Sequence, residues 1–596
     1  LYEHILAEIL AHSRLNDVGA LHEGFWVDHW TYNLDLIDAF LEIYPERLEE
    51  LLLTKEYFFY DNPDVVLPRR LKHVLVDGKV RQYCAVIRDQ KKLELIRGRR
   101  ELPTLVRTAY GRGRVYRTTL LVKLLSLLVN RMATLDPRGL GIEMEADKPG
   151  WNDSANGLPG IFGSSLCETL ELIRLCRFLR NAIPQIKRCR EIPIYEELVD
   201  FMRGLERAIQ RRLKGGSPFR YWDESNRLKE LYRERTKFGI SGREFQVSLK
   251  RVQRFLDLCL KLLENVFAPE NLKLIMNPRG VPYTYFINEV ADYEVIWKDP
   301  RRKIPLCGPS GHPCVRVKRF KPRPVSLFLE GPVHMLRVEP QQAAAIYRAV
   351  RRSPLYDRKL RMFKVCESLE REPFEIGRVK AYARGWLENE SVYLHMEYKW
   401  LLELIRSGLH REFFEEIRHA LVPFLDPQVY GRSILEGVSA IVSSAFPDER
   451  LHGRGVQPRL SGVTAEMIHM WTLMVAGPSP FRLENDGLVL GLRPILPGWM
   501  FTKKRVKRTY YEPGGKPKTV EMPKNSFAFR FLGRCLVVYH NPKRLDTFQE
   551  GVRVVSYKLR YRDGREVEVK GETLGSRLAR DIREGRVERI DALISR

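Results

Sequence analysis

The chain has 596 residues, of which 44% are hydrophobic, 10% aromatic and 30% charged. This composition excludes general disorder, and the length exceeds what one hydrophobic core organises, so we expect at least two domains. No apolar run approaches the roughly 20 residues that a membrane-spanning helix needs, so we expect no membrane partner.

Lys and Arg together number 101 against 75 Asp and Glu, which gives a formal net charge of +26. Such a charge attracts phosphate-bearing ligands in general. It is scattered along the chain, without a basic tail or zinc-finger spacing, and therefore does not favour specific binding of nucleic acid.

The nine cysteines show no paired spacing. A disulfide framework is therefore excluded, and the reducing cytoplasm is the expected compartment. Cys307 and Cys314 flank His312, but two thiols and one imidazole fall short of a four-ligand zinc shell. We expect a loop here, and neither a metal site nor an organic cofactor in the protein.

Hydrophobic residues at helical spacing dominate the chain up to about residue 190. Residues 32–44 place an apolar stripe on one face, made of Leu34, Ile37, Phe40, Leu41 and Tyr44. Residues 120–128 form an apolar run too long for a typical strand. Polar and aromatic loops separate such segments, so the pattern predicts a helical scaffold that presents its loops at one end.

A charged stretch follows this first helical part. Between residues 192 and 271, Arg, Lys and Glu recur at helical offsets. They indicate solvated helices inserted at about 190–300, as a lid or as the contact of a homodimer. Residues 277–325 are rich in Pro and Gly and predict an irregular excursion. The helical pattern resumes at 340–349, 395–425 and 464–476.

Strand-like segments replace the helical pattern near residue 485. They are bounded by Gly, Pro and Asn turns and comprise residues 488–494, 527–531, 535–539 and 552–561. Arg562-Asp-Gly-Arg565 is a hairpin signal, and residues 573–590 suggest a closing helix. We therefore expect a helical catalytic domain over 1–484, and a C-terminal antiparallel β-sandwich with a terminal helix over 485–596.

The most distinctive loop of the sequence spans residues 147–165. Its Pro and Gly residues enclose Trp151, Asn152 and Asp153. Pro and Gly fix the backbone, while an indole beside an amide and a carboxylate can stack on a sugar ring and bind its hydroxyls. The loop indicates either a carbohydrate site or a rigid turn around a buried Trp.

Four segments that lie far apart in the sequence resemble signatures of the cellobiose and chitobiose phosphorylase family. Trp151-Asn-Asp-Ser-Ala-Asn156 is similar to the family's Trp-Asn-Asp-Gly-Met-Asn, and Glu388-Asn-Glu-Ser-Val-Tyr-Leu-His395 to its Glu-Asn-Gly-Gly-Ile-Phe-x-His. Two further segments look like other family motifs: Leu327-Phe-Leu-Glu-Gly-Pro332, and Leu460-Ser-Gly-Val-Thr-Ala465 with the later Pro494-Ile-Leu-Pro-Gly-Trp499. The resemblance covers most of residues 20–510, apart from the charged insertion.

The resemblance implies a mainly α fold, an (α/α)6 toroid of helices followed by the β-sandwich. The family also carries an N-terminal β-sandwich that this sequence, which starts at Leu1, lacks, so we expect an N-terminally truncated chain. The implied activity is inverting phosphorolysis of a β-linked gluco-oligosaccharide. Inorganic phosphate is then the co-substrate, and a sugar 1-phosphate is released.

The same resemblance assigns roles to individual residues. Asp153 matches the general acid, a carboxyl that must hold a proton against the glycosidic oxygen. The acidic residues just upstream would help it to do so: Glu143, Glu145 and Asp147. Phosphate binding is assigned to residues at and near a predicted helix start: His395, Ser461, Gly462 and the flanking Arg459. Sugar binding is assigned to Trp26, Asp28, Trp151, Asn152 and Glu388.

One departure from the family keeps other interpretations open. The family has Tyr-Arg-Asp where this chain has Trp26-Val27-Asp28, so an arginine is missing, and Ser461 replaces a Thr. An inverting hydrolase on the same scaffold, with Glu436 or Glu397 as the base that activates water, is the second interpretation. A non-catalytic carbohydrate-binding protein is the third.

Overall fold

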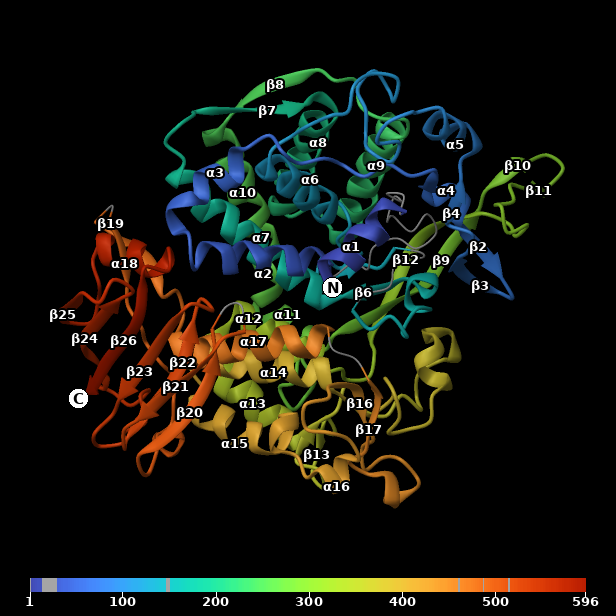
Figure 1. Ribbon diagram of the computed structural model, residues 1–596. Helices are drawn as coiled ribbons and strands as arrows, with labels where there is room; N and C mark the ends of the chain where they lie inside the picture. Colours follow the sequence, from blue (N-terminus) through green and yellow to red (C-terminus); the bar gives the residue numbers. More distant parts are fainter. Residues whose placement is uncertain (1, 13–28, 146–150, 459–460, 486, 513–514) are drawn as a thin grey trace.

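The structure is a computed structural model that describes residues 2–12, 29–145, 151–458, 461–485, 487–512 and 515–596 (Figure 1). It is about 40% helical and 25% strand, with many small sheets and one larger sheet shaped like half a barrel. The expectation of a mainly α protein built as an (α/α)6 toroid is therefore wrong. The strands that overturn it lie both between the helices and after them.

Helices run from the top of the molecule through its centre to the lower part in Figure 1, and α18 lies among the strands at the left. They are α1 (Tyr2–Ala11), α2 (His29–Leu41), α3 (Leu48–Leu53), α4 (Arg69–Lys72), α5 (Gln90–Arg97), α6 (Leu120–Met132), α7 (Leu166–Ala182), α8 (Glu196–Leu213), α9 (Pro218–Thr236), α10 (Leu249–Leu263), α11 (Pro269–Ile275), α12 (Glu330–Val338), α13 (Ala343–Arg352), α14 (Leu394–Arg406), α15 (His410–Ala420), α16 (Pro427–Tyr430), α17 (Ser461–Ala476) and α18 (Ser576–Arg583). α12 lies between α7 and α14, and α14 also contacts α15 and α17.

α14 is buried on every side. Its covered positions run from Leu394 and Met396 through Trp400 to Ile405, which excludes the one-sided pattern of a surface helix. This enclosure matters for the site, because α14 begins one residue before His395. The packing around α14 therefore fixes where that imidazole lies.

The charged stretch of the sequence forms packed helices of the scaffold. α10 buries Val252, Phe255 and Leu256 and contacts α7 and α8, while Lys250 and Arg254 stay exposed. α9 and α10 begin at serine caps, and each serine hydroxyl accepts the backbone N–H of the third residue of its helix. The charges therefore mark the outer faces of helices whose inner faces belong to the core.

Two long strands run through the region that the sequence predicts to be irregular. β9 (Tyr285–Val295) pairs antiparallel with β12 (Val315–Pro324). With β6 (Gly163–Ser165) and β5 (Ile142–Glu143) they form a four-stranded sheet of order β12-β9-β6-β5. The prolines that suggested a loop are tolerated because β12 is an edge strand, where a missing N–H breaks no ladder.

The other strands among the helices are two to five residues long, too short for an alternating pattern to show in the sequence. Six pairs are β1 (Asp64–Val66) with β4 (Val86–Arg88), β2 (His73–Val76) with β3 (Lys79–Gln82), β7 (Glu191–Tyr195) with β8 (Glu244–Ser248), β10 (Trp297–Asp299) with β11 (Ile304–Pro305), β13 (Tyr356–Asp357) with β14 (Met362–Phe363), and β18 (Phe481–Glu484) with β19 (Gly487–Leu490). A three-stranded sheet has β16 (Val438–Ile441) in the middle, between β15 (Val392–Tyr393) and β17 (Gly455–Pro458).

The C-terminal part is a mixed sheet, not the predicted antiparallel sandwich. Its order is β22 (Ser526–Phe531), β23 (Cys535–His540), β26 (Val587–Ser595), β24 (Arg553–Tyr561) and β25 (Glu566–Lys570), and β23 pairs parallel with β26. β20 (Val506–Tyr511) and β21 (Pro517–Met522) form a separate hairpin. These strands lie at the lower left of Figure 1, in orange and red.

The helix expected over 573–590 is also wrong in its second half. α18 ends at Arg583, and Gly585 follows with a φ of 80°, a conformation that favours glycine and stops a helix. Val587, Ile590 and Ala592 are then buried in β26. The eight charged residues between positions 573 and 590 are typical of a helix surface, which is why the sequence did not indicate the strand.

One hydrophobic core runs from Trp30 to Ile594 and joins the helices to the C-terminal sheet. The Tyr539 hydroxyl on β23 donates to the Val475 carbonyl on α17 at 2.6 Å, and Arg583 pairs with Glu46. The C-terminal sheet therefore packs against α17. Within the part of the chain that the structure describes, no helix has the length and apolar character needed to cross a membrane.

Candidate active site

A cavity of about 930 Å³ opens between α2, α17 and β22. Five residues assigned from the sequence line it together: Trp151, Asp153, Glu388, His395 and Gly462. Asn152 is fully buried behind them and does not line it. Ser461 is the first residue of α17, but its side chain lies outside the described residues, as do Trp26, Asp28 and Arg459.

Two glycines lock the Asp153 loop against the segment around residue 377. The Gly157 N–H donates to the Ile376 carbonyl at 3.0 Å, and a Cβ at Gly157 would overlap the Glu375 carbonyl oxygen. Gly377 has a φ of 128° and lies against Asn156. Close backbone contact is thus the reason why this loop needs glycine. It gives Asp153 a rigid base.

Asp153 and Glu388 form a carboxyl pair at the cavity wall. Arg378 pairs with Asp153, with 3.2 Å between Nη2 and Oδ2. Burial, together with the negative charge of Asp153, raises the pKa of Glu388 to about 7. A buried acid without its own cation keeps its proton near neutral pH, so Glu388 is the member of the pair that carries it.

Ser154 connects Glu388 to the buried Asn152. The Ser154 Oγ lies 2.8 Å from both the Asn152 Oδ1 and the Glu388 Oε2. A hydroxyl has one hydrogen, so it cannot donate to both oxygens at once. Asn152 Oδ1 already accepts the Ala155 N–H at 3.2 Å, so the single hydrogen of the Ser154 hydroxyl can be donated to Glu388. This hydrogen bond acts to lower the pKa of Glu388, but burial and the charge of Asp153 outweigh it.

The acids upstream of the loop do not contribute to this pair. Glu143 accepts a hydrogen bond from the Trp222 indole at 2.7 Å, and Glu145 binds Arg233. Both partners belong to α9. The sequence predicted that these acids help Asp153 to hold a proton, whereas the structure pairs Glu143 and Glu145 with side chains of α9; Asp147 lies outside the described residues.

The His395 ring lies against the first turn of α17. A Cβ at Gly462 would overlap the ring, so only glycine permits this contact. The His395 Nε2 lies 3.4 Å from Glu466 Oε1. Burial acts to raise the pKa of Glu466, but the hydrogen bond to His395 and the charge of Lys399 outweigh it and lower that pKa. An imidazole is thus held beside the N–H groups that begin a helix of 16 residues.

Aromatic rings and one buried cation surround Trp151. Its ring is 5.4 Å from that of Tyr393 and 5.7 Å from that of His395, both edge-on. The Lys399 ammonium lies 5.6 Å from the Trp151 centroid and 4.6 Å from that of Tyr32. These contacts fix the indole plane at the cavity, as a wall that stacks on a sugar requires.

Three further residues of the cavity carry no sequence signature. Ser439 on β16 has a buried hydroxyl without a hydrogen-bond partner in the described structure. Asp35 and His469 line the cavity from α2 and α17. Burial acts to raise the pKa of Asp35, but Arg337, Arg174 and Arg406 lower it to about 2. A single polar residue within a longer pattern does not indicate from the sequence that it lines a cavity.

The bases named for a hydrolase do not line the cavity. Glu397 is fully buried and accepts the Phe363 N–H at 2.9 Å. Glu436 pairs with Arg432 at 2.7 Å. Neither can activate a water molecule beside Asp153 from where it lies.

No protein-family model matches the chain, and a search of curated proteins finds no significant match. The function is therefore argued from the cavity and its residues.

Proposed function

We propose that the protein is an inverting glycoside phosphorylase that cleaves a β-linked gluco-oligosaccharide with inorganic phosphate. One observation carries the proposal: the same cavity is lined by the Glu388 carboxyl, whose pKa is about 7, and by the His395 imidazole, which lies at a helix N-terminus. The first group suits proton donation, and the second suits binding of an anion. Trp151 adds a flat wall for the sugar.

In the proposed reaction a phosphate oxygen bonds to the anomeric carbon as the bond to the glycosidic oxygen breaks. That oxygen takes a proton from the Asp153–Glu388 pair, and a free sugar and a sugar 1-phosphate of inverted configuration leave. An inverting phosphorylase needs no second carboxylate, since phosphate is already the nucleophile. It needs donors that hold the phosphate in line, which His395 and the start of α17 supply.

The proposed phosphate position needs positive charge, because the chain has Val27 where the resembling family has arginine. Lys399 is near enough to Glu466, the partner of His395, to lower the pKa of that carboxyl. It is buried, so its charge acts at short range and with little screening. We assign to Lys399 part of the electrostatic role of the missing arginine.

The test is to mix the protein with β-gluco-oligosaccharides and measure sugar 1-phosphate with and without phosphate. The reverse reaction is followed as phosphate released from glucose 1-phosphate in the presence of a panel of sugar acceptors. We expect turnover that depends on phosphate and falls by at least about a hundredfold in Asp153→Asn. Equal sugar release in phosphate-free buffer, with no sugar 1-phosphate formed, would refute phosphorolysis.

An inverting hydrolase is the second candidate, supported by two ionised carboxylates in the same cavity. The pKa values of Asp35 and Glu466 are both lowered against the effect of burial, by surrounding arginines and by His395 and Lys399 respectively. Such groups suit the base that activates water. The same assay decides, because only a hydrolase releases sugar without phosphate, and Glu466→Gln would then abolish that release.

A further inference from the structure

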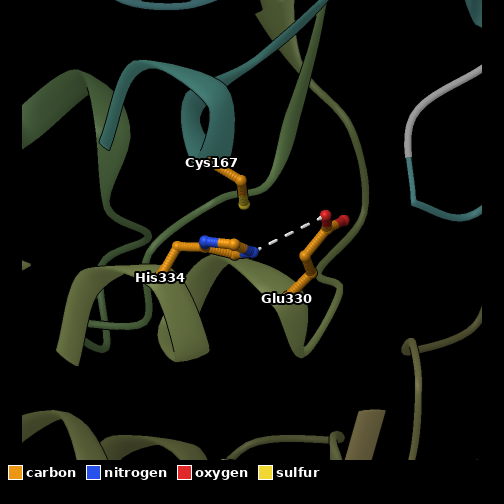
Figure 2. A group of neighbouring side chains, drawn as sticks. All are labelled: Cys167, Glu330 and His334. Atoms are coloured by element: carbon orange, nitrogen blue, oxygen red, sulfur yellow. Dashed lines mark ion pairs between the residues drawn. The ribbon is translucent and has the colours of Figure 1, made fainter. Parts of the chain in front are cut away.

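Three side chains that bind metals in other proteins meet below the cavity. Cys167 lies in the first turn of α7, and Glu330 and His334 lie one turn apart on α12 (Figure 2). One ligand atom from each lies within 4.8 Å of the others, and all three residues are buried. None of them lines the candidate active site, so the cluster is a separate feature of the molecule.

The outer hydrogen bonds orient two of these three groups. His334 Nδ1 lies 2.7 Å from Glu171, and the Tyr285 hydroxyl donates to Glu330 Oε2 at 2.6 Å. Those contacts turn His334 Nε2 and Glu330 Oε1 toward each other at 3.9 Å. A carboxylate on the far nitrogen of a histidine is the arrangement that holds metal-binding imidazoles in their neutral, ligating form.

The surrounding charges are arranged to accept a cation. Glu171 is already matched by Arg174 at 3.1 Å and by Arg337 at 3.3 Å. A divalent ion would therefore find its counter-charge in the Glu330 carboxylate and the Cys167 thiolate. The thiol proton is released to solvent when the sulfur binds.

We propose that Cys167, Glu330 and His334 bind a divalent cation, with zinc as the metal that this ligand set suits best. Zinc accepts thiolate, imidazole and carboxylate together in a tetrahedral shell. Ligand atoms in such a shell are about 3.3–3.8 Å apart, which follows from its bond lengths. The observed spacing reaches these values by small side-chain rotations. A water molecule or the Tyr285 hydroxyl completes the shell.

The metal would tie α7 to α12, which in turn contacts α14, the helix of His395. Its role is thus structural, and it is independent of the proposed reaction. No metal site is expected from the sequence, because Cys167 precedes the Glu330–His334 pair by more than a hundred and sixty positions and that pair alone is no zinc motif.

The test is metal binding by the full chain. The protein is stripped with a chelator, loaded with Zn²⁺, freed of excess ion and analysed by mass spectrometry of the elements. We expect about one zinc ion per chain, and its loss in Cys167→Ser and His334→Gln. Cys176→Ser is the matched control, because Cys176 is also buried on α7 but lies outside the cluster and donates to the Leu256 carbonyl.

Cobalt gives a second readout, which does not depend on the variants folding. Co²⁺ bound by the wild-type chain should show a thiolate-to-cobalt absorption band in the near ultraviolet. Zn²⁺ should also raise the unfolding temperature of the wild-type chain, because it binds only the folded state. A wild-type chain that takes up neither ion, or a Cys167→Ser chain that folds and binds zinc as well as the wild type does, would overturn the proposal.

Discussion

At the scale of single residues, the candidate site depends on where one proton resides. The pKa of Glu388 is raised to about 7 by burial and by Asp153, against the hydrogen bond from Ser154, which acts to lower it. The acid matched by resemblance, Asp153, is instead paired with Arg378. The two carboxyls therefore act together, because the negative charge of Asp153 favours the protonated form of Glu388.

The first prediction concerns the pH dependence of turnover. If Glu388 supplies the proton, kcat/KM should fall about tenfold per pH unit once the pH exceeds about 7. Ser154→Ala should shift this fall to higher pH, because the serine contact lowers the pKa of Glu388. The measurement is a pH–rate profile of both proteins. A profile that is flat to pH 9 contradicts a donor role for Glu388.

The second prediction concerns stability. The pKa of Glu388 is higher in the folded chain than its ordinary value of 4.5, so the folded state binds more protons than the unfolded state. The contribution of Glu388 to the free energy of unfolding is fully present below about pH 4.5, declines between 4.5 and 7, and is lost above 7. The difference between the two limits is on the order of 3 kcal/mol. Glu388→Gln should therefore be more stable than wild type at pH 8 and equal to it at pH 4, as measured by urea unfolding.

The third prediction tests the contact between His395 and α17. Ala at a helical position normally stabilises by about 0.5–1 kcal/mol relative to Gly. In Gly462→Ala the new Cβ would displace the His395 ring, so we expect activity to drop and the KM for phosphate to rise. Gly160→Ala is the control, because a Cβ there meets only the Gln82 carbonyl oxygen at 3.8 Å. Normal phosphate kinetics in Gly462→Ala would count against a phosphate site at His395.

At the scale of elements, a buried ionic network joins the helices beneath the cavity. Arg337 on α12 lies 2.9 Å from Glu403 on α14, 3.3 Å from Glu171 on α7 and 3.6 Å from Asp35 on α2. One guanidinium thus neutralises acids on three neighbouring helices. The network fixes the register of these helices and, through α14, the position of His395.

The fourth prediction follows from that network. Arg337→Leu leaves buried carboxylates without their cation and should cost about 3–5 kcal/mol at neutral pH. The cost should shrink as the pH falls from about 4 toward 2, where acids such as Asp35, whose pKa is about 2, become neutral. Urea unfolding at several pH values measures this. Arg348→Leu, at an exposed position on α13, should change little.

The sequence was informative where a pattern was long and misleading where it was short. α2, α6 and α17 coincide with predicted helical stretches because each shows several turns of apolar spacing. The strand pairs among the helices are invisible because two to five residues cannot display a period, and β12 is disguised by edge prolines. β26 was missed because its charged outer face reads as helix surface.

The residues of the candidate site were likewise predictable only in part. Trp151, Asp153 and His395 stand in segments with recognisable signatures, and the structure places them on one cavity. Ser154 and Ser439 could not be found in this way, because a serine gains a role only from neighbours that folding brings to it. The direction of Glu143, toward α9, likewise depends on tertiary packing.

At the scale of the whole molecule, the helices and the C-terminal sheet share one core. Phe481 stacks on Phe531 at 5.9 Å, and Tyr539 donates to the Val475 carbonyl. The candidate cavity lies along this boundary, since α17 lines one side and β22 the other. The sheet is therefore part of the site's wall.

The fifth prediction separates the two parts. Residues 1–484 expressed alone should aggregate, because apolar side chains such as Phe481 lose their cover. Co-expression of residues 485–596 should restore soluble protein and activity. Size-exclusion chromatography of both preparations checks this. A monomeric, folded chain of residues 1–484 would show that the core is divisible.

The position of β26 has a consequence for synthesis on the ribosome. β22–β23 and β24–β25 emerge first as two separate hairpins, and the strand that joins them, β26, emerges after both. Until then each hairpin exposes an unpaired inner edge, which can pair with other nascent chains. Because of this strand order, we expect the incomplete sheet to bind chaperones until β26 has been synthesised and pairs with both hairpins.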